Sequence, residues 1–113
     1  MKEGLKTLDE AKTLALVCKI FSNEVRIKIL KLLEREPHTF GSLLKNLNVN
    51  PKILNDSLSL LSEHKLVVKS YPYNVYTLTP AGRVVRQGLS SLLGYLDQVA
   101  DSLCIERGGR RYP

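Results

Sequence analysis

The sequence predicts a mainly helical fold with one small β-hairpin, which is an α+β class. The length of 113 residues suits one domain, since domains usually hold roughly 100 to 200 residues. Several segments repeat apolar residues every three or four positions, the period of a helix with one buried face. Two short runs of β-branched and aromatic residues precede the last of these segments, as the strands of a hairpin would. We therefore expect one domain over residues 1–113.

The first two predicted helices occupy the N-terminal third of the chain. Residues 8–21 place apolar side chains at steps of three and four. Ser22 is the expected N-cap of the second helix, because a serine oxygen can accept from the free N–H groups of a first turn. Pro37 is expected to end that helix, since proline disfavours helical geometry in the residue before it. The second helix is rich in Ile and Leu, so we expect it at the centre of the domain.

A tight turn separates the third and fourth predicted helices. Thr39 is the expected cap of a helix of about two turns over residues 40–47. Asn48 follows, and asparagine tolerates the left-handed conformation that a tight turn requires. Asn50 is then expected to cap a fourth helix that starts at Pro51, where the missing N–H costs nothing.

The fourth predicted helix has one apolar side and one polar side. Its expected packing positions are Ile53, Leu54, Leu58, Leu60 and Leu61. Its polar face carries Lys52, Asn55, Asp56, Ser59 and Ser62. In an arbitrary helix such a face is only the solvated side, so its meaning depends on the elements around it.

A hairpin and a long helix complete the predicted fold. Residues 66–71 and 75–78 are the predicted strands, joined by a turn at residues 72–74 that contains Pro72. The last helix is expected to run from about residue 80 to about residue 105 and to stop at a glycine pair. Residues 106–113 form a basic tail.

The last helix carries an apolar seam. It starts at Thr79 and Pro80, which repeat the arrangement of a cap followed by proline. Its apolar residues follow at steps of four and three, as in a coiled coil, and are Val85, Leu89, Leu92, Leu96, Val99 and Leu103. A second copy of the chain is the expected partner of this seam, with Leu14 and Phe21 of the first helix joining the interface. The alternative is that the helix folds back on the first helix of its own chain.

The composition bounds the partners of the protein. Seventeen Lys and Arg against eleven Asp and Glu give a net charge of +6, which favours an anionic partner such as nucleic acid. No apolar run approaches the roughly 20 residues of a membrane span, and the N-terminal residues lack a secretion signal, so we expect a cytoplasmic protein without membrane contact. No nucleotide-binding loop, pair of catalytic acids or nucleophile–base motif occurs, so we do not expect an enzyme.

The two cysteines, Cys18 and Cys104, lie far apart in the sequence. Neither belongs to a CxxC motif or a Cys/His cluster, so no metal site and no cofactor are predicted. Two buried thiols in a reducing compartment are the favoured interpretation, and a disulfide between them is the alternative. A regulator that responds to a ligand or to oxidation through one of these thiols is a weaker hypothesis.

The order of the predicted elements is that of a winged helix-turn-helix, with a core over about residues 20–80. Four segments resemble those of ArsR and MarR-like transcription regulators, namely residues 22–33, 39–50, 58–67 and 76–82. The last of them, YTLTPAG, is also similar to HxlR and PadR-like regulators. The resemblance spans roughly residues 20–86. It implies a DNA-binding regulator, most simply a repressor, in which residues 50–62 form the recognition helix.

The polar face of this helix supplies the candidate base contacts. A helix fits the major groove, and side chains near its N-terminus can reach base edges. Asn55 is expected to pair with adenine, Lys52 to reach guanine or a phosphate, and Ser59 to contact either strand. The other candidates are Lys45, Asn50 and Asp56 on the helices, and Lys69, Tyr71, Tyr73 and Asn74 on the hairpin, which is the wing. Further phosphate contacts are expected among Lys19, Arg26, Lys28, Arg83, Arg86, Arg107, Arg110 and Arg111.

The sequence also departs from the family pattern. Asp56 stands where many relatives carry a hydrogen-bond donor, and Lys69 stands in place of the usual wing arginines. The third helix, over residues 40–47, lacks the cysteine pair with which some relatives sense metals. Asp56 and the few basic residues of the recognition helix favour an alternative function, a winged-helix module that binds a protein partner and never touches DNA. Tyr71 and Tyr73, beside a proline, could equally pack within the hairpin.

Overall fold

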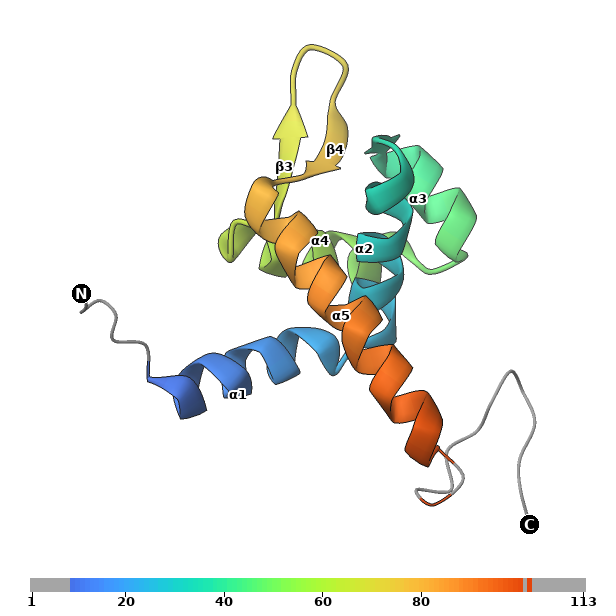
Figure 1. The fold of residues 1–113 in the computed structure, drawn as a ribbon. Coiled ribbons are helices and arrows are strands. Elements are labelled where there is room, and N and C mark those ends of the chain that lie inside the picture. The colour runs from blue at the N-terminus through green and yellow to red at the C-terminus, as the bar shows by residue number, and fades with distance from the viewer. Residues whose placement is uncertain (1–8, 101, 103–113) are drawn as a thin grey trace.

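A computed structural model describes residues 9–100 and residue 102 (Figure 1). The elements in this part of the chain are, in order, α1 (Glu10–Phe21), α2 (Glu24–Arg35), β2 (His38–Thr39), α3 (Phe40–Leu47), α4 (Pro51–Glu63), β3 (Val67–Ser70), β4 (Val75–Leu78) and α5 (Pro80–Val99). Helices form most of the described residues, and the strands form one small antiparallel sheet. The predicted α+β class is confirmed.

Three helices begin at the caps that the sequence predicts. The side-chain oxygen of each cap accepts a hydrogen bond from the amide three residues on, at 3.1 Å for Thr39, 2.9 Å for Asn50 and 2.9 Å for Thr79. All three caps have an extended backbone, which lets the side chain turn back to the first turn of its helix. Pro51 and Pro80 occupy the first turns of α4 and α5, as predicted.

The start of α2 differs from the prediction. Asn23 is its cap, because Asn23 Oδ1 accepts from the Arg26 amide at 3.1 Å. Asn23 has the extended conformation of a cap (φ −130°, ψ 121°), whereas Ser22 is close to helical (φ −82°, ψ 8°) and closes α1. The Ser22 hydroxyl donates to the Lys19 carbonyl oxygen at 2.7 Å. The prediction that Ser22 caps α2 is therefore wrong.

α1 begins later than predicted, and α5 is described as far as Val99. α1 begins at Glu10, after an N-cap at Asp9. α5 ends at Val99, although Ala100 keeps a right-handed helical conformation (φ −59°, ψ −40°). The predicted continuation to about residue 105, including Leu103, and the basic tail at 106–113 lie outside the described residues.

The sheet has three strands in the order β2-β4-β3. β3 and β4 form the predicted hairpin, in which Val67 pairs with Leu78 and Ser70 with Val75. β2 pairs with the other edge of β4, and sequence reasoning missed it because two residues are too few to show a strand period. The tip of the hairpin extends beyond the helices (Figure 1). β2 pairs with the first two residues of β4, Val75 and Tyr76, and so joins the wing to the start of α3.

α2 lies at the centre of the described part of the chain, as predicted. It contacts the other four helices and β4. Its residues Ile29, Leu30 and Leu33 are at most 2% exposed. They pack in one core with residues of α3, α4 and the sheet, which are Leu43, Leu54, Leu58, Leu61, Leu66, Val67 and Leu78. The face of α4 opposite this core is thereby held outward.

The first turn of α5 docks on the loop between α4 and β3. The Thr79 hydroxyl donates to the Lys65 carbonyl oxygen at 2.7 Å, and the Thr79 amide donates to the Leu66 carbonyl oxygen at 3.0 Å. Gly82 packs so closely that an added Cβ would lie 2.1 Å from the Leu66 carbonyl oxygen. Any larger side chain at position 82 would push α5 away from the root of the wing.

Replacing Gly82 by alanine should therefore destabilise the domain. We expect G82A to lower the free energy of unfolding by about 1–3 kcal/mol, because the obstructing atoms are backbone. Urea denaturation followed by circular dichroism measures this change. The matched control is Gly88→Ala in the same helix, where a Cβ meets nothing within 4 Å and should leave stability unchanged or raise it by up to about 1 kcal/mol. Equal stability of both variants would contradict the docking.

Candidate nucleic-acid interface

The turn between α3 and α4 sets the direction of α4. Asn48 adopts the predicted left-handed conformation (φ 54°, ψ 50°), and its amide donates to the Leu44 carbonyl oxygen at 2.9 Å. Two residues later, Asn50 starts α4 as its cap. The two helices thus form a helix-turn-helix in which α4 holds the position of a recognition helix.

The two faces of α4 differ sharply in burial. Its buried residues are Leu54, Ser57, Leu58 and Leu61. The polar residues singled out from the sequence are all exposed, and they are Lys52, Asn55, Asp56, Ser59 and Ser62. Among the positions expected to pack, Leu60 is half-buried. The predicted division into a packed side and a wet side therefore holds for most of the helix.

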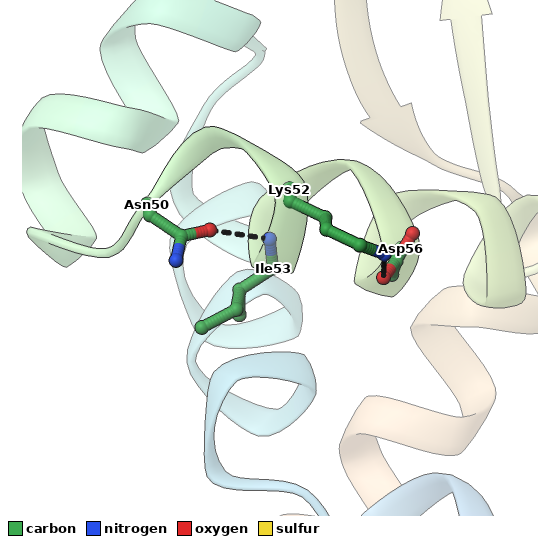
Figure 2. Close-up of polar contacts among 4 residues, drawn as sticks. All are labelled: Asn50, Lys52, Ile53 and Asp56. Carbon is green, nitrogen blue, oxygen red and sulfur yellow. Dashed lines mark hydrogen bonds and ion pairs between the residues drawn. The ribbon is translucent and has the colours of Figure 1, made fainter.

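Lys52 and Asp56 form an ion pair on the exposed side of α4. Lys52 Nζ lies 2.9 Å from Asp56 Oδ2, as Figure 2 shows. Their side chains are 82% and 62% exposed, so the pair contributes only about 0.3–0.5 kcal/mol to stability. A pair this weak can open when either group finds another partner. It also places a cation beside the carboxylate that would otherwise repel DNA phosphates.

The two asparagines of the predicted site have different duties. Asn50 Oδ1 accepts from the Ile53 amide at 2.9 Å, as Figure 2 shows, so its Nδ2 group is left for a partner outside the chain. Asn55 is exposed, and neither its side-chain oxygen nor its side-chain nitrogen makes a hydrogen bond within the described residues. Asn55 therefore keeps the donor and the acceptor that bidentate recognition of adenine needs.

Ile53 differs from the burial that the sequence predicts for it. It was expected to pack, yet it is 43% exposed. The reason is geometric: at about 100° per residue, position 53 lies close to the edge of the buried arc, beside Lys52 and Asp56. A helical projection centred on Lys52 could have revealed this position from the sequence.

The wing carries one cation and two exposed aromatic rings. Lys69 Nζ lies 5.9 Å from the ring centroid of Tyr71 and 5.7 Å from that of Tyr76. Tyr71 and Tyr73 are 75% and 80% exposed, which disfavours the alternative that they pack within the hairpin. Asn74 makes the turn back into β4 with a left-handed backbone (φ 55°).

Several other predicted phosphate contacts are occupied within the chain. Arg26 donates to the carbonyl oxygens of Lys19 and Ile20 at 2.7 and 2.9 Å, where it caps the end of α1. Arg86 is only 9% exposed, and its Nε lies 3.2 Å from Glu34 Oε1. The expectation that Arg86 contacts phosphate is wrong, because its guanidinium is buried between α5 and α2.

The remaining basic candidates differ in their freedom. Lys28 pairs with Glu24 at 3.3 Å on the exposed side of α2. Lys45 in the last turn of α3 is exposed, as are Lys19 and Arg83. Arg107, Arg110 and Arg111 lie outside the described residues. Lys45 is the basic residue of this group that belongs to the helix-turn-helix itself.

The predicted dimer residues fall into two groups within one chain. Leu89 is buried, and Val85 and Phe21 pack against the core, so these three already have partners in their own chain. Leu14, Leu92 and Val99 are exposed, and Leu96 is half-buried. Other exposed apolar residues on the same two helices are Leu16, Val84, Leu93 and Tyr95. Figure 1 shows the N-terminal end of α1 projecting away from the other helices.

Cys18 does not match its expected environment. The prediction of a buried thiol is wrong for Cys18, which is exposed on α1. The cause is that α1 is covered on one side only, with Ile20 as its buried residue. Cys104 lies outside the described residues.

The described residues contain no group of three metal-binding side chains. None of the helices among them is long and apolar enough to cross a membrane.

The chain is similar to known bacterial regulators in sequence and in fold. Residues 23–69, from the cap of α2 into β3, match the family model of the bacterial regulatory protein, arsR family. The fold resembles a protein from Enterococcus faecalis V583 described as a transcriptional regulator of the MarR family, with 23% identity, a TM-score of 0.76, and 88% of this chain and 96% of that chain covered. None of the curated proteins compared matches the chain.

Two further solved structures share the fold. HlyU from Vibrio cholerae N16961 is 25% identical with a TM-score of 0.61, over 75% of this chain and 94% of that chain. The adhesin competence repressor AdcR from Streptococcus pyogenes is 19% identical with a TM-score of 0.55, over 86% and 82% of the two chains. The predicted resemblance and the winged helix-turn-helix fold are confirmed. Residues 23–69 are thus similar to bacterial regulators of the arsR family, and the fold of the chain is similar to that of a regulator of the MarR family.

Asn50, the cap of α4, and Asn55, on its exposed face, should differ in their contribution to stability. Asn50→Ala should lower the free energy of unfolding by about 1 kcal/mol, because it removes the cap of α4. Asn55→Ala on the exposed face should change it by less than about 0.5 kcal/mol. Paired urea titrations measure both values. A larger loss for Asn55→Ala than for Asn50→Ala would contradict this assignment.

Proposed function

We propose that this protein is a sequence-specific DNA-binding regulator that acts as a homodimer on a pseudo-palindromic site and represses transcription. The observation that carries the proposal is the exposed polar face of α4, which directly follows the left-handed turn at Asn48. A helix fits the major groove, and the first turns of a recognition helix approach the bases. The match of residues 23–69 to a family of bacterial regulators supports this use of the face.

The contacts divide between bases and backbone. In the proposed complex, Lys52, Asn55, Asp56 and Ser59 face the base edges, where Asn55 offers both a donor and an acceptor to adenine. The side-chain Nδ2 group of Asn50, at the start of the same helix, is a further donor for these contacts. Backbone contacts come from Lys45 on α3 and from the wing residues Lys69, Tyr71, Tyr73 and Asn74. The wing tip extends beyond the helices, as a minor-groove contact requires (Figure 1).

The exposed apolar side chains of α1 and α5 support the proposed dimer. Leu14 is 63% exposed, and Leu92 and Val99 on α5 are 44% and 43% exposed. Helices with an apolar stripe bury it against a partner, and neighbouring exposed apolar residues mark an interaction surface. A two-fold dimer would present two α4 helices to successive major grooves, about 34 Å apart, and doubles the number of phosphate contacts.

Repression follows most simply from occupancy. A dimer bound over a promoter blocks the polymerase without any further activity, and a related fold belongs to a protein named as a repressor, AdcR. Such a regulator works in the cytoplasm, where bacterial DNA lies. The second candidate function is a winged-helix module that binds a protein partner. The exposed carboxylate of Asp56 favours that candidate, but its ion pair with Lys52 reduces the repulsion toward DNA.

DNA binding should depend steeply on salt. If a dimer makes four phosphate contacts, its affinity for random duplex DNA falls about 100-fold between 50 and 200 mM salt. Fluorescence anisotropy across this range measures the slope. Lys69→Ala should reduce the slope by about 2, one contact in each copy, whereas the exposed Lys12→Ala on α1 should leave it unchanged. Binding that is absent or independent of salt would contradict DNA binding and favour the protein-binding module.

The dimer has its own test in the outer half of α5. Replacing Leu92 and Leu93 together by lysine places charges in the exposed apolar stripe without touching the buried Leu89. Sedimentation equilibrium should give the wild type twice the 12.7 kDa mass of one chain and the double variant a single mass. The control is Val84→Lys, an exposed residue outside the seam. A wild type that sediments as one chain would refute the dimer.

A further inference from the structure

Ile53 is out of place on an otherwise polar surface. It is the one large apolar residue of α4 that is exposed, at 43%, and the whole of α4 lies within the described residues. It lies in the first turn of the helix, where its amide is held by the Asn50 cap at 2.9 Å (Figure 2). Its side chain therefore projects from a fixed backbone position, three residues after the Asn50 cap of the proposed recognition helix.

More than half of the Ile53 surface is covered within the chain, and the 43% that stays exposed adjoins charged side chains. The neighbouring exposed positions, Lys52 and Asp56, are charged and 82% and 62% exposed. The buried contacts of α4 are made by Leu54, Leu58 and Leu61. A partner with an apolar group within reach of the first turn of α4 would bury the isoleucine.

The major groove offers one apolar group at the base edges, which is the 5-methyl group of thymine. We propose that Ile53 is a base-reading residue that packs on a thymine methyl group, beside a cytosine whose amino group donates to Asp56. This inference rests on the proposed DNA-binding function and adds the base that the site selects. It assigns Ile53 to recognition although isoleucine forms no hydrogen bond.

Asp56 gives the inference a second, geometric constraint. Side chains three residues apart on a helix have Cβ atoms about 5–6 Å apart, so Ile53 and Asp56 reach neighbouring points of a groove. Successive base pairs are about 3.4 Å apart, which limits the two contacts to within about two base pairs of each other. In one chain the Lys52 ammonium pairs with Asp56 at 2.9 Å. When Asp56 accepts from the cytosine amino group instead, Lys52 becomes free to contact the guanine of that base pair or a phosphate.

The test begins with selection of bound fragments from a pool of random duplex DNA by the full chain. The selected duplex is then remade with each thymine replaced singly by uracil, which removes only the methyl group. At one thymine in each half-site we expect uracil to weaken wild-type binding about fourfold, the value of one buried methyl group. The variant Ile53→Ala should bind the thymine and uracil duplexes equally at that position.

Control variants separate recognition from folding. Val84→Ala removes an exposed apolar side chain from α5 and should keep the fourfold preference for thymine. Ile53→Val keeps a branched apolar side chain, so it should keep part of the preference for thymine over uracil. The thermal midpoints of all three variants should match the wild type, since each change is at an exposed position. Selection with Asp56→Ala should lose a cytosine within about two base pairs of the critical thymine.

The outcomes distinguish this inference from the proposed function. If the wild type enriches a motif but no uracil substitution weakens binding, Ile53 reads no methyl group, while DNA binding stands. Loss of the thymine preference in Val84→Ala, or its survival in Ile53→Ala, would also overturn the inference. A chain that enriches no DNA at all would refute the proposed function together with it.

Discussion

The outward face of α4 depends on the backbone conformation of the turn that precedes it. Asn48 must take a left-handed conformation to reverse the chain after α3, and Asn50 must be extended to cap α4. Both requirements are met by asparagine, which tolerates the first and supplies the side-chain oxygen for the second. With the start of the helix held in this way, Leu54, Leu58 and Leu61 reach the core that α2 provides. The same rotation of the helix leaves the polar residues and Ile53 outside.

The wing is held by a second junction at the opposite end of α4. The hydroxyl of Thr79 and the absence of a side chain at Gly82 bring the first turn of α5 onto the backbone of Lys65 and Leu66. β3 starts directly after these residues, so the root of the wing and the end of α4 share one support. β2 adds a third strand and joins the wing to the start of α3. The helix and the wing therefore keep a fixed relative position, which a surface that follows two grooves of DNA requires.

The sequence predicted the elements whose signals are local. Caps at Thr39, Asn50 and Thr79 and the turn at Asn48 follow from side-chain chemistry within four residues, and the polar face of α4 follows from the residue spacing along one helix. The errors arose where the outcome depends on distant packing or on angle. β2 exists only because β4 pairs with it, Arg86 is buried because α5 crosses α2, and Ser22 and Asn23 both have the chemistry of a cap. Ile53 was misplaced because apolar character was read as burial without regard to its direction on the helix.

The charge of the α4 surface bears on why two copies would be needed. Lys52 and Asp56 cancel each other, so the exposed face of one recognition helix adds little net attraction for phosphate. Arg26 and Arg86 donate to groups of their own chain, so their guanidinium groups are not free to contact phosphate, although they still count in the net charge of +6. Among the described residues, the helix-turn-helix and the wing of a monomer offer mainly Lys45 and Lys69 for phosphate contacts, which is few for tight binding at physiological salt. Linking two such surfaces makes the second contact intramolecular and raises the overall affinity without any new side chain. In the proposed dimer, the apolar residues of α1 and α5 therefore raise the DNA affinity without contacting DNA, because they link the two surfaces.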